Sequence, residues 1–158
     1  MTVHRDHVPF GGASFLLTHR DAKGNLLWEE TVHNLVTTAG RDFLHAQCYA
    51  SSGIGSNGLN YIALSNDSGS PSTSDTTLTG EIVSNGLARA QGTVAHTSGT
   101  DTTTVSKTFT CSGSAQSCQK LALFTQSSGG TMCHETAFTQ RNLNPGDTLA
   151  VTASITLG

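Results

Sequence analysis

Residues 149–157, "LAVTASITL", decide the fold class of this chain. Leucine, valine, alanine, isoleucine and leucine occupy every second position, and alanine, threonine, serine and threonine stand between them. Successive side chains of a strand point to opposite faces, so this pattern predicts a strand with one dry and one wet face. A helix would scatter the same apolar residues around its axis. The threonines and the isoleucine also favour a strand, because their side chains are stiff at χ1.

Further strands are expected upstream of this segment. The segments "ASFLLTH" (13–19) and "LLWEETVH" (26–33) flank the turn residues "RDAKGN", which predicts a hairpin. Other short apolar segments bounded by turn residues are also read as strands: 61–64, 87–96, 103–110, 119–125 and 131–139. Seven or eight strands at roughly even spacing predict a mainly β protein, an antiparallel β-sandwich or a jelly-roll-like barrel.

One short α-helix is expected, over about residues 38–50. The segment "NLVTTAGRDFLHAQCYA" places apolar residues at helical spacing, and Thr37 or Thr38 can cap its first turn. The length of 158 residues predicts a single domain. We expect residues 1–12 to form an N-terminal arm and residues 13–158 to form the sandwich.

The composition excludes several classes of function. Only 12% of the residues are charged, about half the usual ~25%, and the 8 lysines and arginines are scattered singly. Nucleic acids and anionic membranes require clustered cations, so we expect neither as a partner. The longest apolar runs are far shorter than a membrane span, and the N-terminus has no signal-peptide core. The chain has 42 serine and threonine residues, which predicts a neutral, hydroxyl-rich surface.

No reactive or metal-binding motif stands out, so we expect no enzyme, no cofactor and no metal site. The four cysteines have no zinc spacing. Cys111 and Cys118 flank "SGSAQS", which is read as a hairpin loop, so a disulfide between them is a candidate, although a reducing cytosol opposes it. The alternative is a pair of buried free thiols. Cys133 and His134 are neighbours in a predicted strand and should point to opposite faces.

Several segments in a fixed order resemble a family of small structural proteins of tailed-phage virions. These are "DAKGNLLWEETVHNLVTTAGRDFL", "YIALSNDSGSPSTSDTTLTGEI", "GLARAQGTV", "KTFT", "LALFTQSSGGTMCHETAF" and "NLNPGDTLAVTASITLG", and the likeness covers roughly residues 13–158. The resemblance implies a capsid cement, or decoration, protein or, as the alternative, a tail-fibre or tail-tip module. The implied partners are the major capsid protein and further copies of the chain in a homotrimer, on a virion made in the cytoplasm of a bacterial host.

Two regions are candidates for contacts with neighbouring subunits. In the N-terminal arm, the apolar residues Val3, Val8, Pro9 and Phe10 could anchor a neighbour or the capsid shell, or else pack on their own domain. Trp28 could serve in core or interface packing. A third functional alternative is a glycan-binding adhesin domain, which would need Trp28 or the tyrosines exposed in a groove. The hydroxyl-rich residues 66–77 are expected to form an exposed loop, either a contact surface or a spacer.

Overall fold

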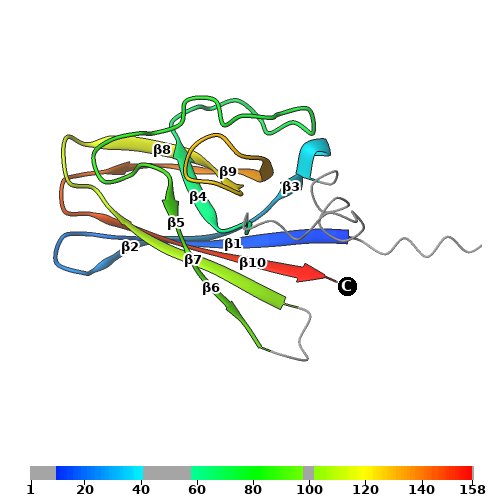
Figure 1. The fold of residues 1–158 in the computed structure, drawn as a ribbon. Helices are drawn as coiled ribbons and strands as arrows, with labels where there is room; N and C mark the ends of the chain where they lie inside the picture. The colour runs from blue at the N-terminus through cyan, green and yellow to red at the C-terminus, as the bar shows by residue number, and fades with distance from the viewer. Residues whose placement is uncertain (1–9, 41–57, 98–101, 158) are drawn as a thin grey trace, which may run out of the picture.

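A computed structural model of the chain describes residues 10–40, 58–97 and 102–157. Within these ranges it is a sandwich of two five-stranded sheets (Figure 1). The strands are β1 Phe10–Arg20, β2 Leu26–His33, β3 Leu35–Val36, β4 Tyr61–Ser65, β5 Ala90–Gln91, β6 Thr93–His96, β7 Thr102–Thr110, β8 Gln116–Phe124, β9 Met132–Leu143 and β10 Thr148–Leu157. The expectation of an antiparallel β-sandwich is confirmed.

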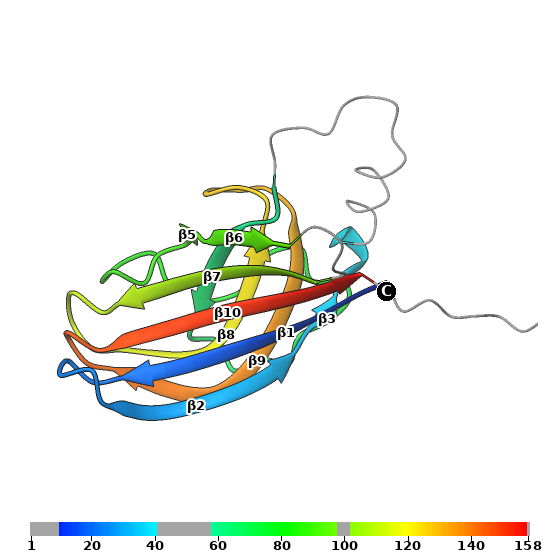
Figure 2. The same ribbon diagram turned by 90° about the horizontal axis from the view of Figure 1, so that it is seen from below.

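The first sheet, sheet A, has the strand order β2-β1-β10-β7-β6, and the second, sheet B, has the order β3-β9-β8-β4-β5. All the strand pairings found among the described residues are antiparallel. Figure 2 views the molecule from the side of sheet A and shows β2, β1, β10 and β7 side by side. Figure 1 shows the two sheets as separate layers with the long β4–β5 connection beyond sheet B.

Strand β10 occupies the centre of sheet A, as its alternating sequence demands. It pairs with β1 on one side and with β7 on the other. Leu149, Val151 and Ala153 are fully or almost fully buried, whereas Thr152 and Ser154 between them are partly exposed. The dry face of the predicted strand therefore turns toward sheet B and its wet face turns to solvent.

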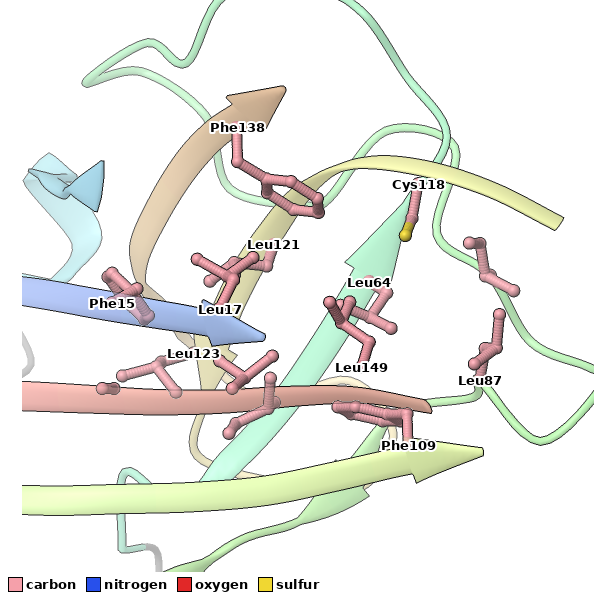
Figure 3. Close-up of a cluster of buried hydrophobic side chains, with 14 of the residues drawn as sticks. Phe15, Leu17, Leu64, Leu87, Phe109, Cys118, Leu121, Leu123, Phe138 and Leu149 are labelled. Carbon is pink, nitrogen blue, oxygen red and sulfur yellow. The ribbon is translucent and has the colours of Figure 1, made fainter. Parts of the chain in front are cut away.

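The main core fills the space between the two sheets. Phe15 and Leu17 of β1 point toward Leu121 and Leu123 of β8, and Leu64 of β4 lies beside them (Figure 3). These five side chains have no exposed surface. Burying a side chain of this size contributes roughly 1.5–3 kcal/mol relative to leaving it in water, so this layer is the main source of stability.

At each lateral edge of the sandwich, the chain crosses from one sheet to the other through a single residue. At one edge only Asn34 separates β2 of sheet A from β3 of sheet B. The backbone of Asn34 donates to Ala13 O at 2.9 Å, and its side-chain oxygen accepts from Ala13 N at 2.6 Å. The side-chain amide thus continues the hydrogen-bond ladder of β1 while the backbone turns away to sheet B.

At the opposite edge only Gly92 separates β5 of sheet B from β6 of sheet A. The single strand expected over 87–96 is therefore wrong: it is two short strands in different sheets, and residues 87–89 precede them. A Cβ on Gly92 would lie 2.8 Å from Val105 Cγ1 and 3.0 Å from Ser106 O, so the bend needs a residue without a side chain.

The expected hairpin between Cys111 and Cys118 is also wrong. Residues 111–115 link β7 of sheet A to β8 of sheet B, so this connection is an arch over one end of the sandwich. The predicted turn at Gly129–Gly130 is confirmed, because β8 and β9 pair and both glycines have positive φ, 62° and 72°.

The expected helix is confirmed at its beginning. Residues 38–40 are helical, and the Thr37 hydroxyl accepts a hydrogen bond from the backbone N–H of Gly40 at 3.0 Å, as an N-cap residue does. Residues 41–50 of the expected helix lie outside the described residues. Strand β1 begins at Phe10, which pairs with Leu157, three residues before the strand expected over 13–19.

The residues 66–82 cover the outer face of sheet B rather than extending into solvent as a spacer. Leu78 is 5% exposed and packs with Phe124 and Met132 in a second, smaller core on that face. The backbone N–H of Ile82 donates a hydrogen bond to Leu64 O at 2.8 Å. The hydroxyl-rich segment is thus tied to the sheet by a few apolar residues and many backbone contacts.

Truncating Leu149 to alanine should lower the free energy of unfolding by about 2–5 kcal/mol, because it leaves a cavity in the central layer. Ser154→Ala, on the wet face of the same strand, should change it by less than about 0.5 kcal/mol. Urea unfolding followed through the fluorescence of the single tryptophan measures both changes. Equal losses for the two variants would contradict the assignment of the faces.

Candidate functional site

The outer face of sheet A is a broad surface of uncharged side chains, which we call the hydroxyl face. It is formed by the outward residues of β1, β10 and β7: Ser14, Leu16, Thr18, Thr148, Ala150, Thr152, Ser154, Thr156, Thr102, Thr104, Ser106, Thr108 and Thr110. Ten or more neighbouring hydroxyl and methyl groups give it both hydrogen-bonding and apolar character. Figure 2 looks onto this side of the molecule.

The register of the strands explains why the hydroxyls form rows. Paired residues share a face, so Thr152 lies beside Ser106 on one side and Leu16 on the other. Across the end of the sheet, the hydroxyls of Thr102 and Thr156 lie 3.3 Å apart. Among the described residues of these strands, the charged groups that point to this side lie at the margins of the face, as with Arg20 at the end of β1 and Glu29 on β2.

Two open hollows lie on the hydroxyl face. One, of about 300 Å³, is bordered by β10, β7 and the start of β6, including Thr93, Ser106 and Thr152. The other, of about 370 Å³, lies near the opposite end and includes Ser14 and Ser154. Their linings combine hydroxyl-bearing residues with Gln91 and Lys107 in the first hollow and with His33 and Asn34 in the second. Such shallow polar hollows suit contact with a protruding side chain of another molecule.

A compact cluster of charged groups lies on the opposite side of the molecule, beneath residues 66–82. The ammonium group of Lys120 on β8 lies 2.6 Å from Asp67 Oδ2 and 3.4 Å from Glu135 Oε1. Lys120 and Glu135 are 3% and 1% exposed. The Asp75 carboxyl group lies within hydrogen-bonding reach of Glu135. We call these four residues the Lys120 cluster.

The environment shifts the ionisation of the Lys120 cluster. Burial, together with the neighbouring Asp75 carboxyl group, raises the pKa of Glu135 to about 7. The hydrogen bond from Lys120 lowers the pKa of Asp67. Burial opposes protonation of Lys120, but the hydrogen bond to Asp67 and the charge of Glu135 outweigh it and raise the pKa of Lys120. One carboxyl group of the cluster therefore exchanges its proton near neutral pH.

Trp28, expected in core or interface packing, makes core contacts, and its interface role stays a prediction. It is half-buried at the edge of the main core, and its ring centroid lies 6.1 Å from that of Phe138 on β9. The guanidinium carbon of Arg141 lies 4.2 Å from the ring centroid, a cation–π contact. Trp28 therefore joins the edge of sheet A to sheet B, and its ring does not form an open aromatic platform of the kind that the glycan-binding alternative needs.

Val3, Val8 and Pro9 lie outside the described residues, so the contact predicted for them stays a prediction. The backbone of Phe10 begins β1.

Cys111 and Cys118, considered as a disulfide pair, are free thiols with no exposed surface. The Cys111 thiol contacts Leu143 O at 3.5 Å. Burial, together with the neighbouring Cys111, raises the pKa of Cys118 to about 12. Both side chains belong to the main core and serve there as small apolar groups.

Cys133 and His134 are both buried and form no reactive pair. Cys133 is the extra residue of a bulge in β9, and burial raises its pKa to about 12, which suppresses the thiolate. His134 pairs with Leu123, which faces the main core. The Asn34 side-chain amide donates to His134 Nδ1 at 2.5 Å, so this ring nitrogen is the acceptor and the ring is neutral. Burial lowers the pKa of His134 to about 4.

Comparison with known proteins gives no relative for this chain: no family model and no curated protein matches it. Among the described residues, no helix is long and apolar enough to cross a membrane. Function therefore has to be argued from the surfaces and the clusters themselves.

His134 should make the fold sensitive to mild acid. Its folded-state pKa is depressed from 6.5 to about 4, so below pH 6.5 the unfolded state binds a proton that the folded state does not. This contribution to stability is fully present above pH 6.5 and is lost as the pH falls to about 4, by up to about 3 kcal/mol. His134→Gln should lack this part of the pH dependence in urea unfolding. An identical pH profile for both proteins would contradict the assignment.

Proposed function

We propose that this protein is a structural component of a phage virion that binds the outside of the capsid as a cement protein. The observation that supports the proposal is the hydroxyl face, a wide uncharged surface on the three longest neighbouring strands of sheet A. The sequence resemblance to small virion proteins supports it from a second direction. The contact partner is the outer surface of the major capsid protein.

A neutral hydroxyl surface suits adhesion on a particle that leaves the cell. Hydroxyl groups do not titrate, so a contact built on them keeps its hydrogen bonds through changes of pH. Ion pairs at a surface weaken as salt screens them, whereas the hydroxyl face has charges only at its margins. Stable interfaces bury about 800 Å² on each partner, and a face of three long strands offers an area of that order.

The two faces of the sandwich are suited to different tasks. Sheet B is covered by residues 66–82, which bury Leu78 and Lys120 on its outer side. Sheet A carries no such cover in the described part of the chain, and Leu16, on β1 beside the central strand, is 40% exposed. We assign the contact with the capsid to the uncovered sheet.

A homotrimer is the assembly that we propose for the free protein. Three copies related by a symmetry axis would each bring a hydroxyl face of moderate affinity to the lattice, and joint binding would far exceed that of one copy. Placement on a tail fibre or tail tip is the alternative within the same class. Attachment of the purified protein to tails and not to capsids would decide for it.

Mixing the purified protein with undecorated capsids tests the contact. The unchanged protein should co-sediment in a fixed ratio to the lattice sites, and the bound amount should change little between low and high salt, because no ion pairs are made. Thr152→Lys places a charge at the centre of the hydroxyl face and should weaken binding at least tenfold, since an unpaired charge would be desolvated.

Val83→Lys is the matched control, because it adds the same charge at a side chain that is 77% exposed, after the residues that cover sheet B. It should bind like the unchanged protein. Binding that survives Thr152→Lys but fails with Val83→Lys would contradict the assignment of the face. No binding to any capsid, with a monomeric mass in solution, would overturn the proposed function.

A further inference from the structure

We propose that Lys120 and Asp67 join in an intramolecular isopeptide bond, with Glu135 as the group that moves the protons. The inference stands on the geometry of the Lys120 cluster and is independent of the proposed function. Lys120 Nζ lies 2.6 Å from one oxygen of the Asp67 carboxyl group, so the amine and the carboxyl carbon are already neighbours. Residues 67 and 120 lie 53 positions apart in the chain, so the fold alone brings them together.

Asp67 is held in place from several sides. Its backbone N–H donates to the Ser65 hydroxyl at 2.9 Å, and that hydroxyl donates to Thr79 O at 2.5 Å. Gly80, with φ of +66°, packs against it so closely that a Cβ at Gly80 would lie 3.1 Å from Asp67 Cβ. A held carboxyl group and a held amine give the high effective concentration that amide formation needs.

Glu135 is suited to the proton transfers. Its carboxyl group is 1% exposed, and its Oε1 lies 3.4 Å from Lys120 Nζ. Its other oxygen, Oε2, is buried and accepts no hydrogen bond from the described residues. A buried carboxyl group that gains and loses its proton near pH 7 is effective in general acid–base catalysis.

The reaction balances without any other reactant. Glu135 accepts one proton from the Lys120 ammonium group and passes it to the Asp67 carboxylate. Nζ then attacks Asp67 Cγ. Glu135 accepts a second proton from the nitrogen and passes it to the same Asp67 oxygen. One Asp67 oxygen leaves with both protons as water, and a neutral amide replaces a partly buried ion pair. Forming the amide removes the charge of Lys120, whose side chain is only 4% exposed, and this favours the product because burying ions is costly.

The cluster has no evident alternative use. No three metal-ligating side chains among the described residues are arranged to hold a metal ion. An ordinary ion pair would explain the contact between Lys120 and Asp67, but it leaves the buried Glu135 carboxyl group with an oxygen that lacks a hydrogen-bond donor. An amide between Lys120 and Asp67, formed with Glu135 as the proton carrier, gives the carboxyl groups of both Asp67 and Glu135 a role.

The intact mass of the full chain decides the matter. After incubation at neutral pH and unfolding in acid, the protein should weigh less than its sequence by one water molecule, with any loss of Met1 counted separately. Proteolysis should release a branched peptide in which Lys120 is joined to Asp67. A protein of full sequence mass, or a lost water without the branched peptide, would overturn the proposal.

Three variants and one control separate the roles. Lys120→Arg keeps the positive charge but cannot form the amide, and Asp67→Ala removes the acceptor, so both should keep the full mass. Lys107→Arg, on β7, is the control and should lose the water like the unchanged protein. Loss of water from Lys120→Arg would overturn the bond. Glu135→Gln should slow the reaction by on the order of 100-fold, and an unchanged rate would remove Glu135 from the mechanism.

Discussion

The whole architecture depends on the burial of alternate side chains of β10 between the two sheets. Leu149, Val151 and Ala153 face the core, and the strand that carries them is hydrogen-bonded on both sides. A shift of register by one residue against β1 or β7 would turn threonines into the core and leucine into water. This single constraint fixes the order of sheet A and determines which face of it is left with hydroxyl groups.

The two sheets differ in what lies on their outer sides, and this difference organises the functional argument. Sheet B is covered on its outer face by residues 66–82, so β8 is buried over most of its length and β9 from Met132 to Thr136, with Lys120 and Glu135 enclosed. Sheet A is buried on one face only. The isopeptide bond that we propose therefore lies under the cover of sheet B, and the contact with other molecules that we propose lies on sheet A.

The sequence was sufficient where a local pattern decides the structure, and insufficient where distant segments meet. The alternation in 149–157 and the glycines at 129–130 act over neighbouring residues, so both were predicted. Nothing local distinguishes a strand that crosses to the other sheet at Gly92 from one that continues, nor an arch after Cys111 from a hairpin. The Lys120 cluster joins residues from three separate segments, so no motif announces it. The hydroxyl-rich composition did indicate the neutral surface, but not which sheet carries it.

At Asn34 on one edge and at Gly92 on the other, a single residue links a strand of sheet A directly to a strand of sheet B. Because these links are so short, sliding or separating the two sheets would break strand pairs next to each link. Movements of this sandwich should therefore be confined to its ends, where the arches lie. A protein built in this way transmits a load from one layer to the other as a rigid plate.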